Sequence, residues 1–244
     1  IIIQNMEKNI GLTNRPLIII TFLVGMCSII YELLISTTSS YLLGDSIRQF
    51  SIIIGIYLAS MGLGSYFSRF MEKDLLMKFI IVELLLGLVG AFSVPLCYYY
   101  FAYSDASGYQ IFVLFLVFLI GALTGFEVPI LTRIMEVKFD LKDNISNILT
   151  FDYLGALVAT LIFPFFLVPM VGLYKSSMIF GLINISVGLT TIYLYKDYLQ
   201  ANKSFKRLLT LFTIVLMIVI GYMISVSDAY LDKWNSSIYK YPVV

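Results

Sequence analysis

Residues 109–136 read YQIFVLFLVFLIGALTGFEVPILTRIME, and this stretch decides the fold class. Its charged side chains are confined to its second half, at Glu127, Arg133 and Glu136. A transmembrane helix needs roughly 20 consecutive, predominantly apolar residues to cross a hydrocarbon core of about 30 Å. The stretch therefore predicts a helix that spans a lipid bilayer.

The rest of the chain repeats this character. Further long apolar stretches lie at residues 16–43, 49–70, 75–102, 147–171, 173–195 and 207–227. The composition agrees, because 60% hydrophobic and 13% charged residues, with a mean hydropathy of +0.94, leave too little polar surface for a water-soluble particle. We expect an all-α, polytopic integral membrane bundle of seven transmembrane helices over residues 1–235, with the lipid bilayer as its main partner.

The basic residues orient this bundle. Most Lys and Arg residues fall in the loops that share a side with the N-terminus. By the positive-inside rule we expect a cell membrane protein with a cytoplasmic N-terminus and, after seven spans, an external C-terminus. The formal net charge is +1, and the cations flank apolar segments instead of forming one basic face. We therefore expect no nucleic-acid partner.

Histidine is absent from the sequence. This excludes histidine-ligated haem, the usual zinc sites and histidine acid–base chemistry within the chain. The two cysteines, Cys27 and Cys97, lie inside apolar spans, where we interpret them as small buried hydrophobic residues. We expect no metal site, no cofactor and no catalytic residue in this chain.

Small residues recur at helix-packing intervals in the second and fifth spans. In lipid, such faces let two helix backbones approach closely. The residues to which we assign helix packing are Gly55, Ala59, Gly62, Gly64, Gly155 and Ala159. Association of several copies of the chain into a homo-oligomer is left open.

Four acidic residues, Glu32, Glu83, Glu127 and Asp152, fall within the apolar spans. An ionised carboxylate in hydrocarbon costs a few kcal/mol or more, so each must be protonated, paired or turned to an interior cavity. One interpretation is a structural network that fixes helix register, and the other is an interior site for a cation. With Arg133 near the same interface, these are our candidate substrate- or cation-binding residues.

Glu32 belongs to a polar stripe along the first span. Gly25, Ser28, Glu32, Ser36 and Ser39 recur at three- and four-residue steps, so they share one helix face. In the fifth span Asp152 lies on a similar stripe of small residues. We therefore predict that Glu32 and Asp152 face one another or share an interior cavity.

Prolines interrupt two of these spans. Pro129 lies two residues after Glu127, and Pro164 and Pro169 lie in the fifth span. A proline inside a helix frees a backbone carbonyl group. Such carbonyls could line a cavity beside the acids, or the prolines could be simple kinks.

Four segments carry a family resemblance: residues 25–32, residues 55–66, GFEVPILTR at 125–133, and residues 152–164, which begin DYLGAL. In this order they resemble the N-terminal membrane domain of membrane-bound spermidine synthase-like proteins, which are polyamine aminopropyltransferases. The resemblance implies that a soluble aminopropyltransferase domain follows the last span. Residues 238–244, IYKYPVV, resemble the beginning of its first strand. We therefore expect residues 236–244 to begin a missing C-terminal soluble domain.

The resemblance sets the functional expectation. We expect a module that anchors an aminopropyltransferase domain and binds or conducts a cationic polyamine. None of the family's catalytic residues maps onto this chain, so the purified chain is predicted to show no aminopropyl transfer. The alternatives are a self-sufficient small transporter or permease, in which the intramembrane acids bind the substrate or coupling ion, and a structural subunit of a membrane complex.

Overall fold

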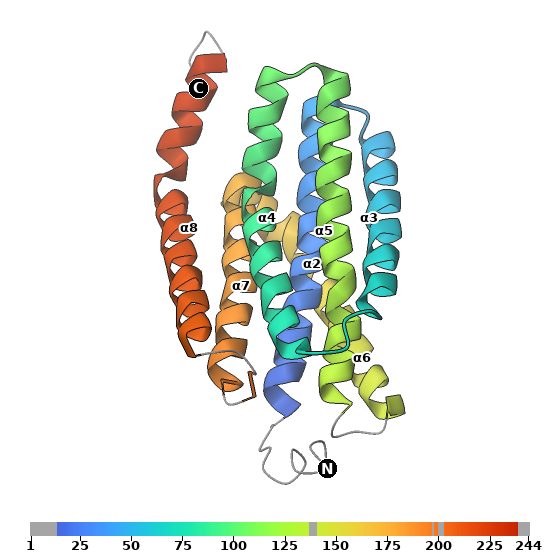
Figure 1. Ribbon diagram of the computed structural model, residues 1–244. Helices are drawn as coiled ribbons and strands as arrows, with labels where there is room; N and C mark the ends of the chain where they lie inside the picture. The colour runs from blue at the N-terminus through green and yellow to red at the C-terminus, as the bar shows by residue number, and fades with distance from the viewer. Residues whose placement is uncertain (1–13, 137–140, 197, 200–202, 239–244) are drawn as a thin grey trace, which may run out of the picture.

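The computed structural model describes residues 14–136, 141–196, 198–199 and 203–238, and every element in them is helical. The elements are α2 (Asn14–Leu43), α3 (Ser46–Ser68), α4 (Leu75–Tyr103), α5 (Ala106–Met135), α6 (Leu141–Ile162), the π-helix η1 (Phe163–Val171), α7 (Leu173–Leu194) and α8 (Lys203–Ile238). They stand side by side in one bundle (Figure 1). The all-α fold class is confirmed for this part of the chain.

Within the described residues, seven segments are long and apolar enough to cross a membrane, as the sequence predicts. They are Pro16–Leu43, Ser46–Ser68, Leu75–Tyr103, Ala106–Met135, Asn144–Val171, Leu173–Leu194 and Ser204–Ser227. Each lies within a few residues of the expected span. The last helix continues to Ile238, whereas residues 239–244, where the resemblance suggests a strand, lie outside the described residues.

Helix α2 forms the centre of the bundle, because it contacts α3, α4, α5, α6 and α7. The outer helices pair around it, α3 with α5 and α4 with α7, while α6 packs mainly on α2. Ser28 and Glu32 on the polar stripe of α2 are buried, and Ser36 and Ser39 are fully buried. The stripe therefore faces the interior of the bundle.

Glycines lie where helix backbones cross most closely. A Cβ atom at Gly64 would overlap the carbonyl group of Ala122 on α5, and one at Gly155 would overlap the carbonyl oxygen of Phe22 on α2. Ala159 is also fully buried. These three residues therefore lie inside the bundle.

The remaining small residues of α3 do not follow the expectation for packing inside the bundle. Gly55, Ala59 and Gly62 are exposed, and a Cβ atom at Gly55 or Gly62 would meet nothing within 4 Å. Adjacent positions on a helix differ by about 100° around its axis, so these three residues share one face of α3, and Gly64 lies on another. Only the face that carries Gly64 meets α5.

Aspartate side chains cap the N-termini of two helices. The Asp45 Oδ1 atom accepts a hydrogen bond from the Arg48 backbone N–H at the start of α3 (3.2 Å). The Asp105 Oδ1 atom does the same for the Gly108 N–H at the start of α5 (3.2 Å). These contacts satisfy backbone N–H groups that have no partner within the helix, which fixes where each helix begins.

Proline explains the change of winding after α6. Pro164 and Pro169 have no N–H group, so the usual bonds to the residue four positions earlier cannot form there. The segment Phe163–Val171 winds as a π-helix, and the Gly172 N–H donates to the Leu167 carbonyl oxygen (2.8 Å), five positions earlier. Gly172 has a φ of 81°, which favours glycine, and it separates η1 from α7.

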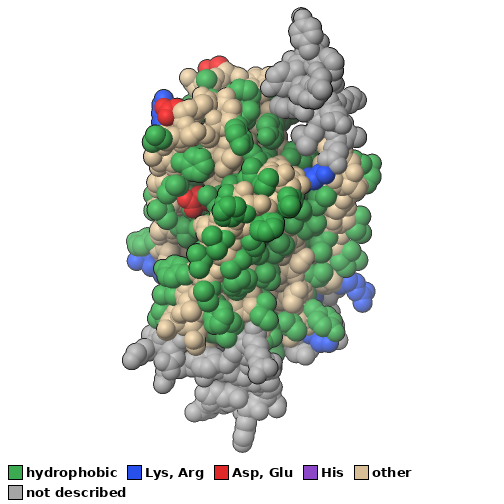
Figure 2. Space-filling model, turned by 180° about the vertical axis from the view of Figure 1, so that it is seen from behind, with side chains coloured by type: hydrophobic (Ala, Val, Ile, Leu, Met, Phe, Trp, Pro, Cys, Tyr) green, Lys and Arg blue, Asp and Glu red, His purple; other side chains and the backbone are tan. Residues whose placement is uncertain are grey.

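The basic side chains gather towards the two ends of the bundle. We call the end where α2 begins and α7 meets α8 the basic end, because it carries Arg69, Lys73, Lys78, Arg133, Lys196, Lys206 and Arg207, whereas Arg48 and Lys175 lie towards the other end. Helix α8 runs from the basic end to the opposite end (Figure 1). Between the ends, hydrophobic side chains cover most of the face seen in Figure 2.

Candidate functional site

Three of the predicted acids come together inside the bundle. We call Glu83 of α4, Glu127 of α5 and Asp152 of α6 the acidic cluster, because Glu127 interacts electrostatically with both of the others. Glu83 is fully buried and Glu127 is 2% exposed, while Asp152 is half-buried. Three helices that lie apart in sequence thus place their carboxyl groups in one region.

The Glu83 and Glu127 carboxyl groups interact electrostatically. No N–H or O–H group of the described residues donates to either oxygen of Glu83. An ionised carboxyl group can only accept hydrogen bonds, so two of them side by side need a proton or a cation between them. The geometry therefore provides a buried acceptor pair.

Glycines let the helices that carry these acids approach closely. The Cβ position of Gly188 on α7 lies 3.6 Å from the Glu83 Cβ atom. A Cβ atom at Gly25 of α2 would lie 2.5 Å from the Asp152 Oδ1 atom. Because Gly25 has no side chain, the Asp152 carboxyl group can lie directly against α2.

Glu32 lies apart from the cluster. It is seven residues beyond Gly25 on α2, which places it about 10 Å further along the helix axis than the contact of Asp152. It is 9% exposed, and its electrostatic neighbour is Tyr57. The structure therefore brings Asp152 to Glu127 and Gly25, and it shows no interaction of Glu32 with Asp152 among the described side chains.

Two buried tyrosines accompany the acids, and sequence reasoning did not single them out. The Tyr57 hydroxyl group donates to the Ser28 carbonyl oxygen (2.9 Å) and lies 3.3 Å from the Thr124 Oγ1 atom, so it links α2, α3 and α5. The Tyr31 ring lies against Gly90, and its buried hydroxyl group has no hydrogen-bond partner in the described part of the chain. Both tyrosines interact electrostatically with Glu127.

Asn184 of α7 was also missed. It is 1% exposed, and neither its amide nitrogen nor its oxygen has a partner among the described residues. It lies one helical turn from Gly188, which contacts Glu83, on the face of α7 that packs on α4. An amide inside an apolar span was a signal that the sequence already carried, because such groups are costly to bury without a partner.

The Arg133 side chain binds backbone carbonyl groups at the end of α3. Its guanidinium group donates to the carbonyl oxygens of Ser68 (2.8 Å) and Met71 (3.0 Å), and its Nε atom to that of Pro129 (3.1 Å). Carbonyl groups at a helix C-terminus have no partner within the helix, and a cation there also complements the helix dipole. Arg133 therefore ties α5 to the end of α3.

We expect Arg133→Gln to lower the free energy of unfolding in detergent by roughly 2 to 3 kcal/mol, because hydrogen bonds from a charged donor to partly buried carbonyls are lost. Arg69→Gln is the matched control. Arg69 is exposed at the same end, and its contacts with Tyr66 and Phe70 stay within its own segment. Equal losses for the two variants, measured by denaturant titration, would contradict the structural role of Arg133.

Comparison with known proteins identifies relatives of this chain. The polyamine aminopropyltransferase of Leptospira interrogans is 44% identical over 173 residues, which cover 71% of this chain and 34% of that protein. Polyamine aminopropyltransferase 2 of Ralstonia nicotianae is 42% identical over 187 residues, covering 75% of this chain and 36% of that protein.

This chain is homologous to part of the polyamine aminopropyltransferases. The resemblance noted in the sequence is thereby confirmed. A more distant polyamine aminopropyltransferase, enzyme 2 of Aquifex aeolicus, is 34% identical over 197 residues, 80% of this chain and 38% of that protein. The chain spans about a third of the length of these relatives. No protein-family model and no solved structure matches it.

Proposed function

We propose that this chain is the membrane-embedded part of a polyamine aminopropyltransferase, and that its intramembrane acids bind a cationic polyamine. The relatives carry polyamine in their names, and aliphatic amines are protonated at neutral pH, as the Lys side chain is. Carboxyl groups complement such a cation. The aminopropyl transfer itself is proposed to need a further domain, so the 244-residue chain alone should not catalyse it.

One observation carries the proposal about the amine. The two oxygens of Glu83 are buried without a hydrogen-bond donor among the described residues, and Glu83 interacts electrostatically with Glu127. A protonated amine supplies the missing donors and the missing positive charge at once. Asp152 is half-buried, so it would meet an amine before the amine reached the buried pair, and Glu32 lies further along α2 as a second acceptor. Binding of spermidine to the purified chain, and its loss when Glu83 and Glu127 are both replaced, tests this assignment.

Placement in a membrane rests on the seven long apolar helices and on the charge at their ends. Helices satisfy their own backbone hydrogen bonds, which any segment within hydrocarbon must do. The basic end would face the cytoplasm by the positive-inside rule. A domain that follows α8 would then lie on the external side.

Thiol labelling in intact cells tests this placement. Both native cysteines are free and fully buried, so an impermeant thiol reagent should leave the wild type unlabelled. We expect it to label Ser107→Cys, which is exposed at the start of α5, and to label Lys73→Cys at the basic end only after permeabilisation. The same charge count predicts that Lys142 and Lys203 are cytoplasmic and that Lys240 is external. The side chains of these three lysines lie outside the described residues.

Two results of the labelling would overturn parts of the proposal. Labelling of Lys73→Cys with protection of Ser107→Cys in intact cells would reverse the orientation. Recovery of the chain in the soluble fraction after cell lysis would contradict its placement in a membrane altogether.

A further inference from the structure

A groove lies between α7 and α8 at the basic end, with a volume of about 540 Å³. Its lining residues are Leu189, Thr190, Ile192, Tyr193, Lys196, Lys206, Arg207 and Thr210. The wall consists of aliphatic, aromatic and hydroxyl side chains, and the three cations come from the end of α7 and the start of α8. The groove therefore has an apolar body and a positively charged mouth.

The cations are available to a ligand. Lys206 donates one hydrogen bond to the Lys196 carbonyl oxygen (2.7 Å), and an ammonium group has two further N–H donors. Lys196 and Arg207 are exposed, with the Lys196 ammonium 5.9 Å from the Tyr193 ring centroid. Residues 196–207 of the sequence contain four cations and a single acid, Asp197. The local charge is positive, so it favours an anionic ligand.

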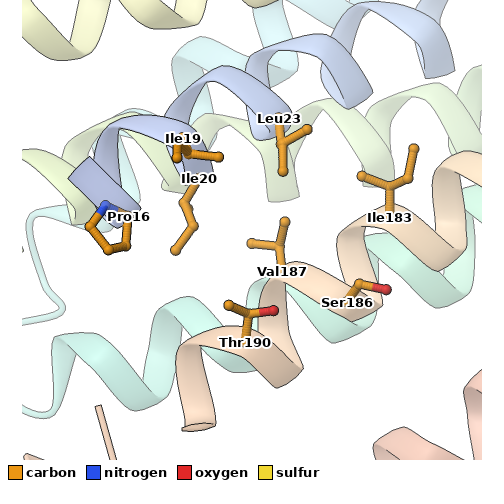
Figure 3. A pocket seen from close by; sticks show the side chains of 8 residues that line it. All are labelled: Pro16, Ile19, Ile20, Leu23, Ile183, Ser186, Val187 and Thr190. Atoms are coloured by element: carbon orange, nitrogen blue, oxygen red, sulfur yellow. The ribbon is translucent and has the colours of Figure 1, made fainter. Parts of the chain in front are cut away.

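A neighbouring groove without charged side chains provides a comparison. Figure 3 shows this second groove, between α2 and α7, which has a volume of about 470 Å³ and is lined by Pro16, Ile19, Ile20, Leu23, Ile183, Ser186, Val187 and Thr190. None of these side chains is charged, so nothing in its lining selects a head group. Thr190 lines both grooves, which places them next to each other on α7.

We propose that the groove between α7 and α8 binds an anionic phospholipid. The phosphate group lies against Lys196 and Arg207, and an acyl chain lies along Leu189 and Ile192. Basic pockets between transmembrane helices on the cytoplasmic side suit anionic head groups. In the described residues α8 contacts mainly α7, so a lipid there would also join α8 to the bundle. The inference rests on the membrane placement proposed above.

Native mass spectrometry of the detergent-purified 244-residue chain tests the inference. Phosphatidylglycerol and phosphatidylcholine with the same acyl chains are compared as probes. We expect tighter binding of phosphatidylglycerol, weakened about fivefold by Lys196→Gln and again by Arg207→Gln, as each surface cation contributes to the attraction. Lys73→Gln, which removes an exposed cation of the basic end outside the groove, should leave the binding unchanged.

A second variant separates a lipid from a free anion. Thr210→Phe fills the groove from α8 without changing its charge, so it should weaken phosphatidylglycerol binding. Inorganic phosphate at millimolar concentration should not displace the lipid. Equal binding of the two lipids, the same loss with Lys73→Gln, or displacement by phosphate would overturn the inference. A chain that enters neither micelles nor liposomes would instead contradict the membrane placement.

Discussion

Gly64→Leu is expected to lower the free energy of unfolding by about 3 kcal/mol, at the upper end of the range for an overpacked helix contact. The Cβ position of Gly64 overlaps the carbonyl group of Ala122, and it lies 3.1 Å from the Gly125 Cα atom. These neighbours are backbone atoms, which cannot rotate aside as a side chain can. A leucine would therefore push α3 away from α5, the helix against which α3 mainly packs.

Gly62→Leu provides the control two residues away. A Cβ atom there meets nothing within 4 Å, and leucine favours a helix over glycine by roughly 0.8 kcal/mol. Stability should therefore stay the same or rise. Denaturant titration of both variants in one detergent measures the difference, and equal destabilisation would mean that α3 packs through a different face.

The sequence predicts the helices well because each of them is a long apolar run bounded by polar or charged residues. It predicts the contacts between helices less well. Gly62 and Gly64 lie on opposite faces of α3, both faces carry small residues, and their spacing alone does not show which face meets α5. That choice depends on how the side chains of both helices pack together, which is decided in three dimensions.

For the candidate site too, the sequence predicts some features and misses others. Burial of the intramembrane acids could be predicted from the cost of charge in hydrocarbon. Their grouping could not, since sequence patterns pair Glu32 with Asp152, whereas the structure places Asp152 near Glu127. Tyr31 and Tyr57 escaped notice because tyrosine in an apolar span also suits a lipid-facing position, and their hydroxyl contacts appear only once the helices are assembled.

Replacing the acids one by one should weaken spermidine binding, and replacing the buried pair should abolish it. Wild-type chain in detergent is expected to melt at a higher temperature with spermidine than without it, because a ligand of the folded state stabilises it. Glu32→Gln and Asp152→Asn should each weaken the apparent affinity roughly tenfold, the effect of losing about 1.4 kcal/mol of ion pairing. They should leave the melting temperature without spermidine nearly unchanged, since Asp152 is half-buried and both replacements keep the size of the side chain and remove only its charge.

The double variant Glu83→Gln/Glu127→Gln should abolish the response to spermidine, because it removes the charge of the buried pair. A glutamine amide can donate to its neighbour's oxygen, so the chain should remain folded. Glu72→Gln, an exposed acid in the loop between α3 and α4, is the control and should behave as wild type. If every acid variant melts earlier and spermidine changes none of the curves, the acids are structural and the proposed amine site is wrong. If spermidine raises the melting temperature of all variants equally, the amine binds elsewhere.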